Sequence, residues 1–91
     1  MRLDSFLKTS RLIKKRVLAK ELCEQGAVTL NGSRTKPSKE VKGGDQIVID
    51  SWKKRIRIEA LDIPRGNVSR GEARELYRVL EEQSKSQTIE W

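Results

Sequence analysis

The chain of 91 residues contains no histidine and a single cysteine, Cys23. The lack of histidine removes the usual general base and the commonest metal ligand. One cysteine can form neither an intrachain disulfide nor a cysteine-based metal cluster. Cys23 lies among apolar residues in a helical pattern, so we expect a buried packing residue rather than a nucleophile.

The carboxylates also offer no catalytic arrangement, because Asp4, Asp45 and Asp50 are scattered and have no partner base. Asp4 suits the first turn of a helix, where the helix dipole favours a negative charge. Asp45 follows Gly43 and Gly44, a pair typical of a tight turn. No Lys-Ser or Lys-Thr follows these glycines as it would in a phosphate-binding loop. We therefore expect a protein that is not an enzyme and that has no catalytic residue, metal site or cofactor.

Long apolar runs and aromatic residues are scarce as well. No run approaches the length of a signal peptide or a membrane-spanning helix, so we expect a cytoplasmic protein with no membrane partner. Of the four aromatic residues, Phe6 and Tyr77 are expected in the core. For Trp52 two roles remain open, packing within the fold and stacking on a base. Proteins that bind single strands through base-stacking platforms usually carry more aromatic residues. A chain this short has little room for an enclosed catalytic cavity.

Positive charge is what the sequence has in excess. Lys and Arg number 20 against 13 Asp and Glu, and residues 1–50 hold 11 basic and 6 acidic side chains. No acidic residue lies between Asp4 and Glu21, a stretch that contains Lys8, Arg11, Lys14, Lys15, Arg16 and Lys20. Solvated surfaces usually interleave both signs. A field of one sign attracts polyanions, so this stretch is a candidate binding surface.

Apolar periodicity predicts an α+β domain. Helices are expected over 3–10 and 15–25, the second ended by Gly26. A hairpin turn is expected at Asn31-Gly32, because this pair favours a type I′ turn. The predicted strands and return segment are 27–30, 35–41, 46–50 and 52–60.

The C-terminal part is predicted to form a third helix. Ser69 and Glu72 have the spacing of a capping box. Ala73, Leu76, Tyr77 and Leu80 would form its apolar face, and the helix would fray near Ser84 before a polar tail. The expected domain organisation is 1–61 for two N-terminal helices packed on a small sheet with an added strand, 62–68 for a linker, and 69–91 for the C-terminal helix and tail.

The basic stretch could bind DNA, RNA, anionic lipid or an acidic protein. Membrane binding needs large exposed apolar residues opposite the basic face, but Leu18 and Leu22 are required for the core. A helix-turn-helix needs polar base-reading side chains, whereas residues 14–20 are mostly Lys and Arg, which suit phosphates. Structured RNA is recognised by its shape and backbone. RNA is therefore the favoured partner, with Arg34, Lys36 and Lys39 of the hairpin and return segment widening the surface.

A family resemblance agrees with this interpretation. The residues that carry it are Arg2-Leu3-Asp4, Phe6-Leu7, Arg11, Arg16, Ala19, Leu22, Gly26, Val28, Asn31-Gly32, Val41, Gly44-Asp45 and Ile47. Together they resemble the alpha-L RNA-binding motif, which is named after small-subunit ribosomal protein S-four. The resemblance covers residues 1–50 without gaps.

Two further features narrow the resemblance. The Lys36-Pro37-Ser38 segment is similar to that of the fifteen-kilodalton heat-shock RNA-binding protein and its stand-alone relatives. The charge-balanced C-terminal segment resembles the Gram-positive RqcP (YabO) family of ribosome-associated quality control. This resemblance implies binding to large-subunit ribosomal RNA, to the large ribosomal subunit and to the tRNA that bears the nascent chain. It also implies support for C-terminal tailing by the partner factor RqcH. Apart from the resemblance, we expect the chain to act as a monomer.

The resemblance places Arg2, Asp4, Arg11 and Arg16 at the motif's RNA-facing positions. The full set of candidate RNA-binding residues is Arg2, Asp4, Arg11, Lys14, Lys15, Arg16, Lys20, Asn31, Arg34 and Lys36. Lys15 departs from the Ser or Thr that many family members use to cap the second helix, and a lysine cannot accept from the unpaired N–H groups there. Either the helix start is looser, or Lys15 exchanges cap stability for a phosphate contact.

Two rival functions remain open. In one, the chain is a ribosome-assembly or regulatory module that binds another protein through its third helix, and RNA binding is incidental. In the other, it is an accessory domain of an RNA-modifying enzyme whose catalytic part lies on a partner chain. Deletion of residues 69–91 would distinguish the first rival, because RNA affinity would persist while protein partners were lost.

Overall fold

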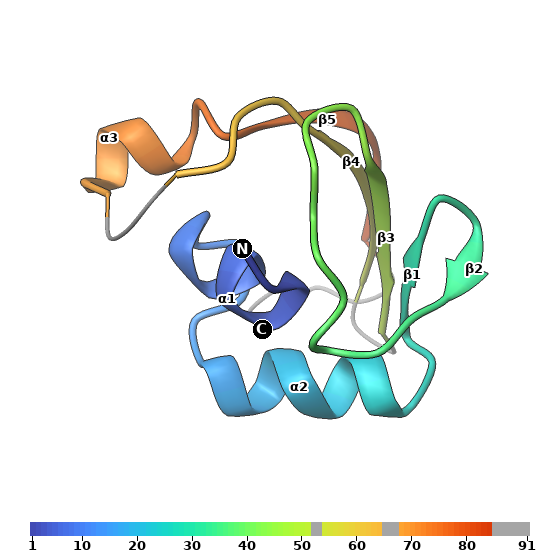
Figure 1. Ribbon diagram of the computed structural model, residues 1–91. Helices are drawn as coiled ribbons and strands as arrows, with labels where there is room; N and C mark the ends of the chain where they lie inside the picture. The colour runs from blue at the N-terminus through green and yellow to red at the C-terminus, as the bar shows by residue number, and fades with distance from the viewer. Residues whose placement is uncertain (52–53, 65–67, 85–91) are drawn as a thin grey trace.

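The computed structural model describes residues 1–51, 54–64 and 68–84. It is an α+β fold, as predicted, with the helices on one side of a single sheet (Figure 1). The elements in chain order are α1 (Leu3–Thr9), α2 (Arg16–Glu24), β1 (Val28–Leu30), β2 (Ser33–Arg34), β3 (Gln46–Asp50), β4 (Lys54–Ala60), α3 (Arg70–Ala73) and β5 (Tyr77–Ser84). None of the helices within the described residues is long and apolar enough to cross a membrane.

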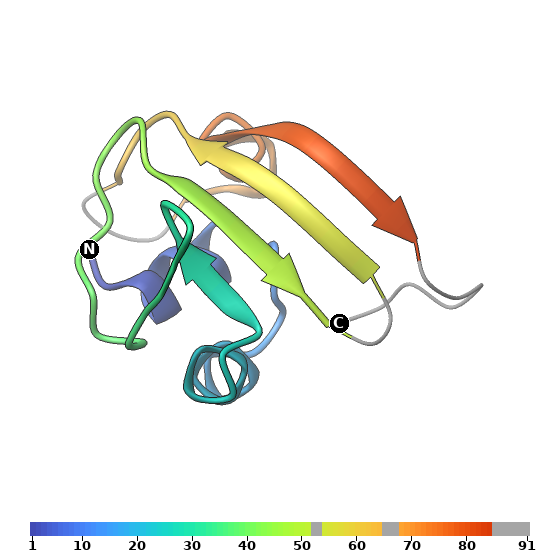
Figure 2. The same ribbon diagram turned by 90° about the vertical axis from the view of Figure 1, so that its right-hand side faces the viewer.

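The strands form one antiparallel sheet in the order β2-β1-β3-β4-β5. Figure 2 shows the face that the helices leave uncovered. Along β4, burial alternates: Ile56, Ile58 and Ala60 are buried, whereas Arg55 and Arg57 between them are partly exposed. This period of two gives the sheet one apolar and one wet face, as the sequence predicts.

The core lies between the sheet and the N-terminal helices. Its fully buried members include Phe6, Leu7 and Ile13 from the helical segment and Ile47 and Ile58 from the sheet. Burial of these side chains holds α1 and α2 in place, because a nine-residue helix is marginal in water without such packing. The positions of the basic side chains on α1 and α2 therefore follow from the core beneath them.

Both predicted turns with positive φ are confirmed. Gly26 (φ 81°) follows α2, its N–H bonds to the carbonyl of Cys23, and the N–H of Ala27 bonds to the carbonyl of Leu22. This is the pattern of a Schellman C-cap. Asn31 (φ 52°) and Gly32 (φ 85°) form the hairpin turn, as a type I′ turn requires.

The return segment differs from the predicted strand 35–41. The paired strand is only Ser33–Arg34, and the chain then leaves the sheet and runs beside the start of α1. The N–H groups of Leu3 and Asp4 donate to the carbonyls of Lys39 and Pro37 at 2.8 and 3.1 Å. These are N–H groups of a first helical turn, which have no partner within their own helix. The return segment therefore caps α1 instead of extending the sheet.

The predicted C-terminal helix with an apolar face through Leu80 is wrong in its extent. The Ser69 side chain does accept from the Glu72 N–H at 3.2 Å, as the capping box predicts, but α3 ends at Ala73. Residues 77–84 instead form β5, which pairs with β4 from Lys54↔Ser84 to Ala60↔Tyr77.

Tertiary pairing explains why the helical pattern failed. Without β5, β4 would be an edge strand with unpaired backbone groups, and Tyr77 and Val79 favour strands intrinsically. Opposite charges also meet across this pair: Arg78 bonds to Glu59, and the Lys54 Nζ lies 3.3 Å from a Glu82 oxygen. Leu80 is 41% exposed, so the apolar residues at helical spacing do not share a buried face.

Candidate nucleic-acid interface

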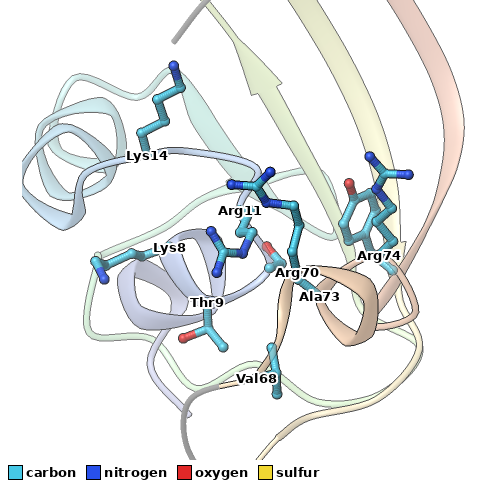
Figure 3. Close-up of a pocket in the computed structure, with 10 residues that line it drawn as sticks. Lys8, Thr9, Arg11, Lys14, Val68, Arg70, Ala73 and Arg74 are labelled. Atoms are coloured by element: carbon cyan, nitrogen blue, oxygen red, sulfur yellow. The ribbon is translucent and has the colours of Figure 1, made fainter.

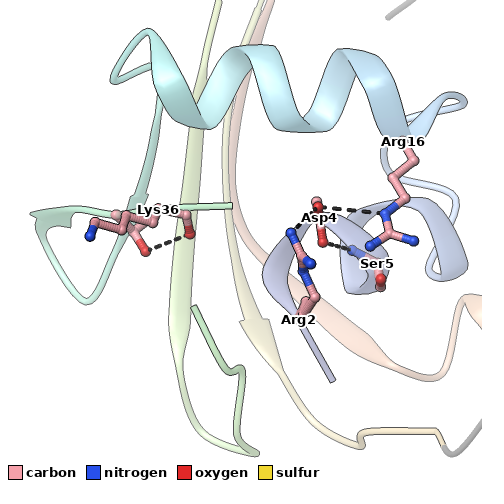
Figure 4. Close-up of polar contacts among 6 residues, drawn as sticks. Arg2, Asp4, Ser5, Arg16 and Lys36 are labelled. Atoms are coloured by element: carbon pink, nitrogen blue, oxygen red, sulfur yellow. Dashed lines mark hydrogen bonds and ion pairs between the residues drawn. The ribbon is translucent and has the colours of Figure 1, made fainter. Parts of the chain in front are cut away.

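Asp4 lies at the centre of the candidate site. It is only 1% exposed, and its Oδ1 accepts from the Ser5 N–H at 2.7 Å. Its Oδ2 accepts from Arg2 Nη2 at 3.2 Å and lies 3.5 Å from Arg16 Nε (Figure 4). One buried carboxylate thus contacts two guanidinium groups, so this cluster keeps a net positive charge.

The two arginines reach Asp4 from different elements. Arg2 is the N-cap of α1, and Arg16 is the first residue of α2. Their side chains remain 49% and 51% exposed, so each can offer N–H donors to a ligand while Asp4 holds its orientation. A guanidinium has five N–H donors, more than one carboxylate can occupy. Three candidates from the sequence are therefore brought together in one cluster.

Lys15 and Lys20 extend this cluster along α2, and both are exposed. Lys15 is the N-cap of α2 and makes no side-chain cap hydrogen bond, as expected for a lysine at this position. Lys20 lies four residues after Arg16, so the two side chains share a face of the helix.

Asn31 and Arg34 lie at the other end of the site and have structural contacts. The Asn31 amide donates to Asp45 Oδ1 at 3.1 Å and accepts from the Gln46 N–H at 2.9 Å, so it joins two turns. Arg34 Nη2 donates to the carbonyl of Glu24 at 2.8 Å, at the last residue of α2. A cation is favourable there because of the helix dipole. Their binding to RNA stays a prediction.

Lys36 is exposed on the return segment that caps α1 (Figure 4). Its neighbour Pro37 accepts the hydrogen bond from the Asp4 N–H, so this segment lies directly beside the Arg2 and Asp4 cluster. The sequence placed Lys36 on a sheet edge, whereas in the structure it follows the short β2, and its side chain points away from the Arg2 and Asp4 cluster (Figure 4).

Arg11 and Lys14 line a cleft of about 810 Å³ at the opposite end of α1 (Figure 3). Arg11 has φ 63°, a conformation that residues other than Gly, Asn and Asp rarely adopt. Arg70 and Arg74 line the same cleft from the C-terminal part and were not among the candidates. Arg70 and Arg74 were not predicted as binding residues because the composition of 69–91 is charge-balanced. Their spacing of four residues nevertheless places both on one helical face.

Cys23 is fully buried in the core, as predicted. Burial, together with the charges of Asp4 and Glu24, raises the pKa of the Cys23 thiol to about 11. The described residues bring together no group of three or more His, Cys, Asp and Glu side chains that could hold a metal. Trp52, the candidate stacking residue, lies outside the described residues.

Residues 1–47 match the S4 domain family. A relative in Halalkalibacterium halodurans, named RQC P-site tRNA stabilizing factor, is 48% identical over 83 residues, which cover 91% of this chain and 93% of that protein. A relative of the same name in Bacillus subtilis is 40% identical, with 91% and 95% covered.

Solved structures agree with this assignment. The trimeric structure of Heat Shock Protein 15 from Vibrio cholerae has a TM-score of 0.80 and 38% identity, and the match covers 87% of this chain and 80% of that one. The solution structure of the hypothetical protein HP1423 has a TM-score of 0.77 and 43% identity, with 89% and 98% covered. The chain therefore belongs to the S4-domain family and, within it, to the group of RQC P-site tRNA stabilizing factors.

Proposed function

We propose that this chain is an RNA-binding factor of ribosome-associated quality control. It binds the large ribosomal subunit and peptidyl-tRNA and supports C-terminal tailing of stalled nascent chains by RqcH. The observation that carries the proposal is the buried Asp4 carboxylate, which holds Arg2 and Arg16 on one exposed surface. The name shared by the relatives, P-site tRNA stabilizing factor, supports tRNA as one ligand.

This geometry suits a phosphate backbone for a physical reason. A free arginine side chain loses rotamer entropy when it binds a phosphate, and a prior contact with Asp4 reduces that loss. The two half-exposed guanidinium groups can still form charge-assisted hydrogen bonds with phosphate oxygens. Lys15 and Lys20 add positive charge on the adjoining helix without acidic partners among the described residues.

We further propose that the chain acts in the cytoplasm as a monomer and by binding alone, without a catalytic step. All ten candidate residues contribute to the RNA-binding surface in this proposal. Arg2 and Arg16 form its centre, and Asp4 acts by positioning them. Asn31 and Arg34 maintain the turns that hold the return segment and its Lys36 in place.

The proposal is tested by isolating the tagged full-length chain from cells and resolving its complexes on a sucrose gradient. It should co-sediment with free large subunits that carry peptidyl-tRNA, and RqcH-dependent tails should be reduced in cells that lack it. The Arg2→Ala/Arg16→Ala variant should lose both properties. A matched variant, Arg57→Ala/Arg78→Ala, removes the same charge from the uncovered face of the sheet and should retain them. Association of the wild-type chain with neither large subunits nor tRNA would contradict the proposal.

The rival protein-binding function has less support. It required a charge-balanced third helix as its contact, and the structure ends that helix at Ala73. The deletion of residues 69–91 is also no longer a clean test, because it would remove β5 and the buried Leu76.

A further inference from the structure

The basic cleft at the end of α1 is separate from the Asp4 cluster. It is lined on one side by Lys8, Arg11 and Lys14, and on the other by Arg70, Arg74 and Tyr77. In Figure 3 Arg11 and Arg70 approach the cleft from opposite sides, one from the turn after α1 and one from α3. Two segments about sixty residues apart in the chain therefore build one site.

The charges of this cleft are all of one sign. Five of its lining residues are Lys or Arg, and none is acidic. Of these five, Lys8, Arg11, Arg70 and Arg74 form no ion pair within the part of the chain that the structure describes. Like charges that converge on a concave surface repel one another and concentrate positive potential there. The group that complements such a cleft is an anion.

The local structure of α3 explains why its acidic residues stay out of the cleft. The Ser69 hydroxyl donates to Glu72 Oε1 at 3.1 Å, so the capping box holds this carboxylate at the helix start. Arg70 and Arg74 lie one helical turn apart and line the cleft, whereas Glu72 and Glu75 do not. Ala73 is fully buried and lines the cleft together with the two arginines.

The backbone conformation of Arg11 is a second observation that supports ligand binding in the cleft. Its φ of 63° lies in the left-handed region, where glycine or asparagine would be less strained. Strained residues of this kind cluster at functional sites. Arg11 lines the cleft from the loop that leads from α1 to Lys15 and Arg16 at the start of α2.

We propose that this cleft is a second phosphate-binding site, in which Arg70 and Arg74 bind the sugar-phosphate backbone of RNA together with Arg11. The proposal rests on the RNA-binding function proposed above, and it extends the RNA footprint from α2 to the C-terminal part, beyond the residues 1–47 that match the S4 domain. Val68 and Tyr77 add apolar surface beside the cations, which suits a ribose or base edge next to the phosphates.

Salt-dependent binding to purified large ribosomal subunits and to a tRNA transcript tests this site. We expect Arg70→Ala/Arg74→Ala to weaken binding to at least one of these RNAs about tenfold or more. The slope of log affinity against log salt should become shallower by roughly two units, one per lost phosphate contact. The conservative Arg70→Lys/Arg74→Lys variant should restore most of the slope, because lysine keeps the charge. The matched control Arg57→Ala/Arg78→Ala should change the slope by less than half a unit for the same loss of charge.

The outcomes separate this proposal from the previous one. If the wild-type chain binds and Arg16→Ala weakens binding, but the Arg70→Ala/Arg74→Ala variant matches its control with both RNAs, the cleft proposal is wrong and the proposed function stands. Binding of inorganic phosphate to the cleft without any effect of the variant on RNA binding would also overturn it. As a second readout, Arg70→Cys carrying a photocrosslinker should form an adduct with RNA, whereas the same group at Arg57→Cys should not. Circular dichroism and thermal unfolding verify that each variant is folded.

Discussion

One carboxylate oxygen of Asp4, Oδ2, lies 3.5 Å from Nε of Arg16, so a buried acid on α1 orients an exposed base on α2. This contact links the two N-terminal helices at the surface while the core links them underneath. The same oxygen accepts from Arg2. An acidic residue therefore helps to build a surface that binds a polyanion.

Asp4→Asn should weaken RNA binding although it makes the chain more positive. The substitution raises the net charge by one unit, which by long-range attraction alone would strengthen RNA binding. We expect weaker binding instead, by roughly fivefold or about 1 kcal/mol, because the two arginines lose their shared anchor. Affinity for a tRNA transcript at fixed salt measures this. Asp62→Asn is the control, since Asp62 is exposed and the charge change is the same; tighter binding by both variants would refute the positioning role of Asp4.

Lys15→Ser tests the lysine that stands at the N-cap of α2 in place of a serine or threonine. A serine hydroxyl at the N-cap can accept from a backbone N–H that the lysine leaves without a side-chain cap. We expect the free energy of unfolding to rise by about 1 kcal/mol and RNA affinity to fall a few-fold. Urea titration and RNA binding measure the two effects. Lys15→Ala removes the charge without adding a cap; if RNA affinity is unchanged in both variants, Lys15 makes no phosphate contact.

Cys23 should be unreactive in the folded chain. At pH 8 a thiol with a pKa of about 11 is almost wholly protonated, and the side chain is buried. Labelling by iodoacetamide should therefore be slow in buffer and fast in urea. Rapid labelling of the native protein at pH 8 would contradict this.

The same shift predicts how stability depends on alkaline pH. Folding raises the pKa of Cys23 from 9.0 to about 11, so the native chain retains a proton that the unfolded chain loses. The stability from the protonated thiol is fully present below pH 9 and is lost as the pH rises toward 11. We expect the difference in free energy of unfolding between wild type and Cys23→Ala to decrease by up to about 2 kcal/mol between pH 9 and pH 11. An unchanged difference would contradict the burial of a neutral thiol.

Leu76→Ala tests whether the C-terminal part belongs to the folded core. Leu76 is 4% exposed and its carbonyl accepts from the N–H of Leu61 at 2.8 Å. A large-to-small change at such a site costs about 2–5 kcal/mol, a large share of the stability of a small domain. Thermal unfolding should show a clear loss. For Leu80→Ala, at a 41% exposed position, the loss should be below about 1 kcal/mol.

Local signals in the sequence predicted much of the fold. The Asn31-Gly32 turn, the Gly26 cap and the Ser69 capping box each depend on a few neighbouring residues, and all three are confirmed. The helices over 3–10 and 15–25 are confirmed to within one residue at each end. The apolar stripe of each helix predicted its extent, and Gly26 also marked the end of the second helix.

Features that depend on distant partners could not be predicted in this way. Residues 77–84 have helical spacing of apolar residues, yet β4 supplies backbone partners that make them a strand. The sequence indicated that Asp4 suits a helix start, but not that it would contact Arg16 from the next helix. The cleft was missed because Arg70 and Arg74 meet Arg11 only in the folded chain.

The most direct test of the central claim is the salt dependence of large-subunit binding by Arg16→Ala compared with Arg57→Ala. Both variants lose one positive charge, but Arg16 lies in the Asp4 cluster and Arg57 on the uncovered face of the sheet. We predict that Arg16→Ala weakens binding roughly fivefold and makes the salt slope shallower by about one unit, while Arg57→Ala stays close to wild type. Equal slopes of log affinity against log salt for Arg16→Ala, Arg57→Ala and the wild-type chain would show that the arginines held by Asp4 do not bind RNA phosphates.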